Sequence, residues 1–109
     1  MTIDFHAHFP RGGSFSQLVE LLPQARIDRI CLCSAGAVFG HASNEEILRG
    51  AGQHPREIVP FALFELGSDG PERVDEYARA GFRAFKITNP RAPYDSPEYF
   101  PVYERMEAL

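Results

Sequence analysis

The sequence predicts a parallel α/β fold of the (β/α) barrel type, with about four strand-then-helix units, which is half of a barrel. Short apolar runs alternate with segments of helical periodicity along the 109 residues, and strands joined through helices pair in parallel. A complete eight-unit barrel needs roughly 250 residues. We therefore expect residues 1–109 to be a single, truncated N-terminal part of a barrel domain, or else a small open α/β domain.

Four short runs are expected to form the strands. The first, Thr2–Phe5, leads directly into a His-x-His motif. The second, Arg29–Ser34, is a continuous apolar run, which is typical of a strand covered on both faces. The third is Ile58–Phe64, where Pro60 counts against a regular central strand. The fourth is Phe82–Ile87.

The helix after the first strand is expected to begin at Ser14, because Gln17 stands three residues later as in a capping box. Leucines and an alanine then recur at helical spacing. Pro23 interrupts this pattern, and proline inside a helix costs about 3 kcal/mol. The helix is therefore expected to end or bend near Leu22.

The three later helices also have end signals. A second capping box, Ser43-x-x-Glu46, opens a helix that runs to about Gly52. The segment Pro71–Ala80 has proline in its first turn and Gly81 as its stop. The last helix opens at residues 96–98, and its apolar residues fall on one stripe. That stripe comprises Tyr99, Val102, Tyr103, Met106 and Leu109.

The composition argues against several classes of partner. The formal charge is −4, from 11 basic and 15 acidic side chains, and no basic run appears, so we expect no nucleic-acid surface. No apolar stretch approaches the roughly 20 residues that span a bilayer, and the N-terminus lacks a secretory signal. Cys31 and Cys33 are interpreted as two buried thiols without a chemical role, which suits a reducing cytoplasm.

The motif Asp4-x-His6-x-His8 carries the clearest chemical signal. Side chains alternate across a strand, so these three residues are expected to share one face and to point into the barrel near the rim where barrel active sites lie. Two imidazoles there can bind one divalent ion, which we expect to be zinc. Asp4 is expected to orient one of the two ligands. Alternatively, the histidines lie in a surface turn before Pro10.

Two further residues are candidates for binding the substrate. Lys86 shares the parity of Phe82 and Ala84, so it is expected to face the barrel interior and to contact an anionic substrate, or else to extend its charge to solvent. His41 lies in the glycine-containing loop after the second strand, on the same rim, either as a substrate contact or as a solvated loop residue. His54 is interpreted as a cap or turn residue on the opposite rim.

The opening Ile3–Pro10, Ile-Asp-Phe-His-Ala-His-Phe-Pro, resembles the amidohydrolase superfamily, and more closely its amidohydrolase-related branch that includes aminocarboxymuconate-semialdehyde decarboxylase. Residues 25–32, 44–62, and 81–87 with 94–97 agree in order and spacing. The resemblance implies a TIM barrel that holds a divalent metal, often zinc, with His6 and His8 as its first two ligands. The family's remaining ligands, from the fifth, sixth and eighth strand ends, would lie beyond Leu109.

The expected function is that of a metal-dependent hydrolase or non-oxidative decarboxylase acting on a small organic acid or its derivative. The metal would activate water or act as a Lewis acid. The alternative is a half-barrel fragment or remnant without turnover of its own, so whether this chain is itself an enzyme stays open. Because the first and fourth strands would expose unpaired edges, we also expect a homo-oligomer or association with a complementary half.

Overall fold

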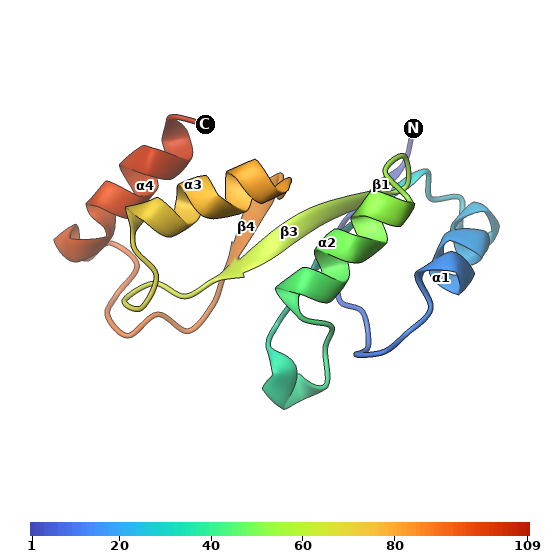
Figure 1. The fold of residues 1–109 in the computed structure, drawn as a ribbon, viewed down its shortest axis with the longest axis horizontal. Coiled ribbons are helices and arrows are strands. Elements are labelled where there is room, and N and C mark those ends of the chain that lie inside the picture. The colour runs from blue at the N-terminus through green and yellow to red at the C-terminus, as the bar shows by residue number, and fades with distance from the viewer.

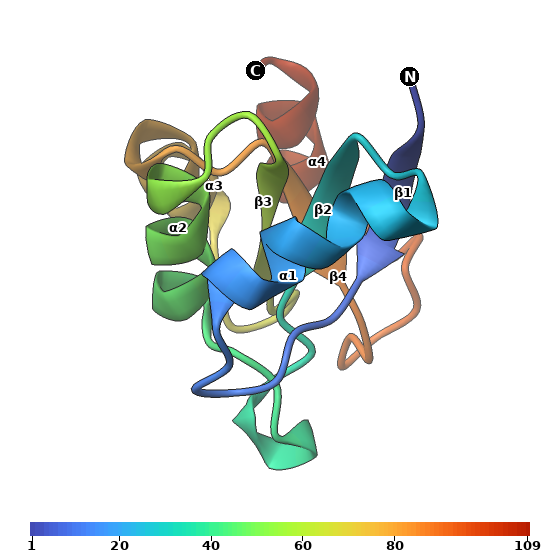
Figure 2. The same ribbon diagram turned by 90° about the vertical axis from the view of Figure 1, so that its right-hand side faces the viewer.

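The four expected strands pair in chain order into one parallel sheet, β1-β2-β3-β4, in a computed structural model that describes residues 1–36 and 38–109. The strands form a curled half-barrel with helices between them (Figures 1 and 2), which confirms the predicted fold class. The strands are β1 (Ile3–Ala7), β2 (Arg29–Cys33), β3 (Ile58–Phe64) and β4 (Ala84–Ile87). The helices are α1 (Phe15–Leu21), α2 (Asn44–Gln53), α3 (Pro71–Ala80) and α4 (Phe100–Glu107).

The two faces of the sheet are distinct along β3. Its even-numbered residues, from Ile58 to Phe64, are buried, whereas Val59, Phe61 and Leu63 between them are half-buried. The buried set packs toward the helices, as expected for a sheet covered on that side. The half-buried set lies on the concave inner face of the half-barrel.

The helix-covered side holds two apolar clusters, one toward each end of the sheet. The first lies beneath α1 and α2, and α3 and α4 cover the second, as the two helix pairs in Figure 1 indicate. The fully buried members of the two clusters with the largest side chains are Leu32, Ile47, Ile58, Phe64 and Val74.

Pro60 lies in a central strand after all, and the expectation that it would disturb β3 is wrong. Its carbonyl accepts a hydrogen bond from the backbone N–H of Arg83, the residue before β4. A residue's N–H and carbonyl point to the same side of a strand, so the donor that proline lacks would face the turn that precedes β4. Pairing of β3 with β4 begins one residue later, at Phe61 and Ala84.

The helix ends follow the sequence signals closely. Ser14 caps α1 by accepting from the Gln17 N–H, and a 3₁₀ turn, Leu22–Ala25, follows with Pro23 near its start. Ser43 and Glu46 form the complete capping box of α2. Gly81, with φ of 115°, ends α3 in the left-handed conformation that glycine adopts without strain.

Three strands have bounds that differ from the prediction. β1 runs from Ile3 to Ala7 and so includes His6, and β2 ends at Cys33, one residue before the predicted end. β4 starts at Ala84 instead of Phe82, because Phe82 folds back on α3: its N–H donates to the Tyr77 carbonyl, and its ring meets that of Tyr77 edge-on at 5.3 Å. Among the described residues, no helix has the length and apolar character needed to cross a bilayer.

Candidate functional site

A β-bulge near the end of β1 determines which side chains face the concave side. Asp4 pairs with Ile30 and Ala7 pairs with Leu32, so Phe5 and His6 together lie opposite one residue of β2. Such a bulge breaks the alternation of side chains. The expectation that residues 4, 6 and 8 would share one face is therefore wrong for Asp4, whereas the side chains of His6 and His8 do meet.

Two contacts show the result of the bulge. The ring of Phe5 meets Phe61 of the concave face edge-on at 5.5 Å, and Nε2 of His6 lies 3.2 Å from Nζ of Lys86 on β4. Asp4 instead falls in register with buried Ile30. Its carboxylate accepts from the backbone N–H of His6 at 3.1 Å, so Asp4 holds the backbone that presents His6 and does not orient an imidazole ring.

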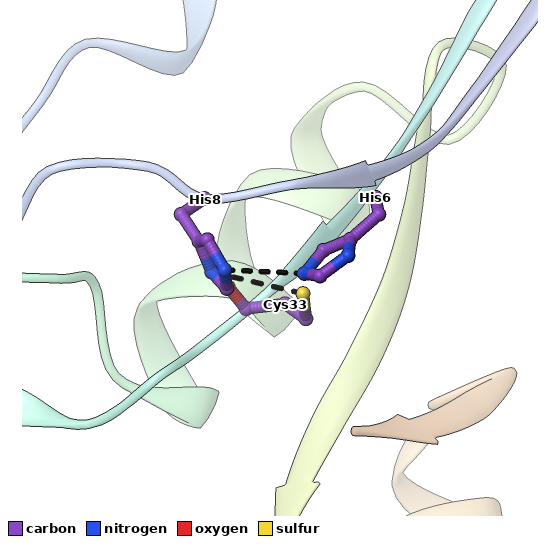
Figure 3. A group of neighbouring side chains, drawn as sticks. All are labelled: His6, His8 and Cys33. Carbon is purple, nitrogen blue, oxygen red and sulfur yellow. Dashed lines mark hydrogen bonds between the residues drawn. The ribbon is translucent and has the colours of Figure 1, made fainter. Parts of the chain in front are cut away.

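The His6 and His8 rings meet at the carboxyl end of β1, with their Nε2 atoms 3.2 Å apart (Figure 3). Nδ1–H of His8 donates to the carbonyl oxygen of Cys33 at 2.9 Å, which leaves the lone pair of the neutral ring on Nε2. Two nitrogens bound tetrahedrally to one zinc ion at about 2.0–2.1 Å are about 3.3–3.4 Å apart. The pair therefore has the spacing of two ligands on one ion.

Cys33 is a member of this group that sequence reasoning missed. One ligand atom each from His6, His8 and Cys33 lies within 4.8 Å of the others, and Sγ of Cys33 is 3.7 Å from Nδ1 of His8. Its thiol donates to the carbonyl of Ala7 at 3.5 Å. Burial raises the pKa of the Cys33 thiol, and the positive charge of Lys86 opposes that shift.

A signal for Cys33 was present in the sequence. Cys33 is the last residue of β2, and its register partner is Phe61 on the concave face. In a parallel sheet the carboxyl end of β2 lies beside the carboxyl end of β1, where the histidines are. The order of the strands and the alternation of side chains along β2 together predict that the Cys33 thiol lies beside the motif that contains His6 and His8.

Lys86 lies where its parity predicts, on the concave face near the end of β4. Lys86 is half-buried as a residue, and its ammonium group can donate to Nε2 of His6 at 3.2 Å. The site thus combines two imidazoles, one thiol and one primary ammonium. This combination places a fixed positive charge beside the position where two ring nitrogens converge.

His41 joins the site through ring stacking. Its ring lies parallel to that of His8, with centroids 4.6 Å apart and an interplanar angle of 2°. His41 is half-buried, and its Nδ1 is buried with no hydrogen-bond partner in the described part of the chain. It therefore has a defined position in the cluster, unlike a solvated loop residue.

The loops after β1 and β2 hold His41 in this position by pairing with each other. Pro10 and His41 form an isolated antiparallel bridge, flanked by bonds from Arg11 N–H to Gly40 and from Ala42 N–H to Phe9. The Glu46 carboxylate accepts from the Gly12 N–H at 3.1 Å in addition to capping α2. Backbone hydrogen bonds from Ser43 and Gly12 lower the pKa of Glu46.

His54 lies away from this cluster, as expected. It forms the C-cap of α2, and its Nε2 is 3.3 Å from Oγ of Ser16. At the amino-terminal rim of the sheet, His54 is not a member of the group formed by His6, His8 and Cys33. His54 is therefore a suitable control position for substitutions of His6 and His8.

Comparison with known proteins supports the architecture. No model of a known protein family and no curated protein matches the sequence. A probable 2-pyrone-4,6-dicarboxylic acid hydrolase from Acinetobacter baumannii, with citric acid bound, matches 98% of this chain with a TM-score of 0.73 and 13% identity. An uncharacterized TIM-barrel protein from Bordetella bronchiseptica matches 98% with a TM-score of 0.74 and 17% identity.

The fold is half of a TIM barrel. The chain covers 46% and 52% of these two solved chains, so it spans about half their length. The active sites of TIM barrels lie at the carboxyl ends of the strands. His6, Cys33 and Lys86 lie at or near the carboxyl ends of β1, β2 and β4, which is the rim where such sites are built.

Proposed function

We propose that this half-barrel supplies the metal-binding part of a metal-dependent hydrolase or non-oxidative decarboxylase. One observation carries the proposal: Nε2 of His6 and Nε2 of His8 converge at 3.2 Å while Nδ1 of His8 is tied to the Cys33 carbonyl. A hydrogen bond at the second ring nitrogen fixes the tautomer and direction of a metal-binding histidine. A pair of imidazole nitrogens suits zinc, which is the metal we propose.

The other side chains of the site have roles that follow from their positions. A bound zinc ion would lower the pKa of a water molecule or polarise a substrate carbonyl. Lys86 would hold an anionic group of the substrate as a point charge. His41, stacked behind His8, would contact the same ligand from the loop after β2. Phe5 and Phe61 would form an apolar wall beside it.

The substrate class that this arrangement favours is a small organic acid or its derivative. An ammonium group beside two imidazoles attracts carboxylates. The Acinetobacter structure, described as a probable dicarboxylic acid hydrolase with bound citric acid, is consistent with this class. Because 13% identity relates the two chains, we transfer the carboxylate chemistry and no particular substrate.

A second function is favoured by the contact between Lys86 and His6. A primary ammonium 3.2 Å from a ring nitrogen repels a divalent ion at that nitrogen and attracts an anion instead. In this alternative, the two imidazoles share a proton and bind a carboxylate together with Lys86, without a metal. A half-barrel without turnover of its own remains compatible with the chain's coverage of about half of each solved barrel.

Zinc stoichiometry tests the metal proposal. The purified chain should retain zinc after dialysis, measured by elemental analysis, and His6→Ala and His8→Ala should each lower the zinc content strongly. His54→Ala, at the opposite rim, should leave it unchanged. Full retention in both site variants would exclude the assignment. Citrate binding in the presence of a chelator, lost in Lys86→Met, would favour the anion site instead.

A further inference from the structure

We propose that Cys33 is a third protein ligand of the ion bound by His6 and His8, so that this half of the barrel contains a two-histidine, one-cysteine site. The inference rests on the proposed metal site and adds a residue to it. The sequence alone predicted two ligands, and Cys33 was interpreted as a buried thiol without a chemical role. The juxtaposition of the ends of β1 and β2 changes that assignment.

The geometry brings the three side chains to one point (Figure 3). Their ligand atoms lie within 4.8 Å of one another. Sγ of Cys33 lies 3.7 Å from Nδ1 of His8, which belongs to the same ring as the Nε2 that would bind the ion. In a tetrahedral zinc site, with Zn–S about 2.3 Å and Zn–N about 2.0–2.1 Å, sulfur and nitrogen are about 3.6 Å apart. A rotation of the Cys33 side chain can bring its sulfur closer to the two nitrogens than the present bound of 4.8 Å.

The bond pattern around the thiol is compatible with metal binding. The Cys33 thiol donates a long bond of 3.5 Å to the Ala7 carbonyl. On metal binding the thiol would lose its proton to solvent, and sulfur would exchange this weak contact for a bond to the ion. The Cys33 carbonyl meanwhile continues to orient His8, so one residue would act both through its backbone and through its side chain.

Charge balance gives a further reason for a thiolate at this position. Two neutral imidazoles leave the full double charge of the ion facing the ammonium of Lys86, which lies 3.2 Å from the His6 nitrogen. A thiolate ligand cancels one unit of that charge. It therefore reduces the repulsion between ion and ammonium. Three protein ligands also leave one position open, as in catalytic zinc sites.

Cys31 provides a matched control on the same strand. It is also buried, and it lies opposite Val59, two residues before Cys33 and farther from the rim. It is not a member of the group formed by His6, His8 and Cys33. Serine replaces the sulfur atom by oxygen at either position. A difference in metal binding between the two variants therefore reflects where the thiol lies in the strand.

The experiment is a titration of the full 109-residue chain with Co²⁺, followed by absorption spectroscopy. The wild-type chain and Cys31→Ser should develop the intense near-ultraviolet band of thiolate-to-cobalt charge transfer. Cys33→Ser should lack this band and should bind Co²⁺ about tenfold or more weakly, since even an outer partner of a metal ligand is worth 10–100-fold. Circular dichroism would verify that the variants fold.

X-ray absorption of the zinc-loaded wild-type chain gives a second measurement that needs no variant. It should show one sulfur neighbour at about 2.3 Å in addition to nitrogen neighbours. Metal bound with nitrogen and oxygen neighbours alone, and without the charge-transfer band, would overturn the role of Cys33 and leave the histidine site intact. Failure of the wild-type chain to bind either ion would overturn the proposed metal function together with this inference.

Discussion

The His8 ring donates its Nδ1 proton to the carbonyl oxygen of Cys33 at 2.9 Å, and this bond joins the loop after β1 to the last residue of β2. A backbone carbonyl can only accept, so the bond selects one tautomer of the neutral ring. The other nitrogen, Nε2, then faces His6 at 3.2 Å with its lone pair. The backbone of one strand therefore determines which atom of the neighbouring motif can bind a cation.

The tautomer of His8 is directly measurable. We expect long-range ¹H–¹⁵N correlation spectra of the neutral ring to show the proton on Nδ1 of His8. His54, whose Nε2 contacts the hydroxyl of Ser16 at 3.3 Å, provides an internal reference in the same spectrum. A proton on Nε2 of His8 would contradict the orientation on which the proposed metal site depends.

Lys86→Met should strengthen the binding of a divalent ion. The ammonium lies 3.2 Å from the proposed ligand atom of His6. Charges of +1 and +2 about 5 Å apart repel by about 1–2 kcal/mol even at the dielectric constant of water, which corresponds to roughly tenfold in affinity. Calorimetric titration with Zn²⁺ measures this change.

The same Lys86→Met variant should bind citrate more weakly, because it lacks the charge that attracts the carboxylates. Arg49→Met, on the exposed surface of α2, removes one positive charge at a distance and should change neither affinity. Weaker zinc binding by Lys86→Met would show that the lysine supports the ion, for instance through a ligand that it holds, and would contradict the repulsion argument.

The positions of the strands and the helix caps followed from the sequence because they depend on local signals. Apolar runs, capping boxes and Gly81 act within a few residues. The sequence did not predict which side chains of β1 face the concave side, because the bulge opposite Cys31 is set by pairing with β2. The stacking of His41 on His8 also depends on a contact between two loops. Such contacts do not change the periodicity of apolar residues in either segment, so the sequence alone does not reveal them.

Asn44→Ala should destabilise the fold measurably. The Asn44 amide donates to the Leu63 carbonyl at 3.0 Å and accepts from the Leu63 N–H at 2.8 Å, and it also donates to the Tyr77 hydroxyl at 3.1 Å. Removing it leaves both backbone groups of Leu63 without these partners, at a cost of about 2–3 kcal/mol. Urea unfolding would measure the change, and exposed Arg49→Ala should stay within about 0.5 kcal/mol of wild type.

We also propose that the half-barrel associates, either with itself or with a complementary half. β1 and β4 are the outer strands of the sheet, so each has one edge without a strand partner in the described chain. Phe5 on the concave face is 71% exposed and Ile3 is 45% exposed. Unpaired edges beside exposed apolar groups favour pairing with another chain.

Light scattering over a wide concentration range tests association. The wild-type chain should form a dimer or larger species, and Phe5→Asp should shift it toward the monomer by placing a charge on the concave face. Val38→Asp is the matched control, because Val38 is 93% exposed in the loop after β2. A clean monomer of the wild-type chain at every concentration would contradict the proposal.

The final prediction is that the metal-loaded chain alone has negligible turnover. Even with Cys33 as a third ligand, the metal-type group contains two histidines and one cysteine and no carboxylate. Asp4, the nearest acidic residue in the motif, is turned toward the backbone of His6. A general base positioned on the substrate contributes about 10²–10⁴-fold in rate. The exposed Phe5 also indicates that water reaches the floor of the site.

The measurement is an activity screen of the zinc-loaded chain against small aromatic and unsaturated carboxylic acids, simple lactones and esters. No substrate should be turned over above the rate of free zinc. In the solved barrels about half of the chain lies outside the matched part, and that half is where a base would be found under this proposal. Metal-dependent turnover that His6→Ala abolishes would instead show that the first four units hold a complete active site, with Lys86 or His41 as the group that moves the proton.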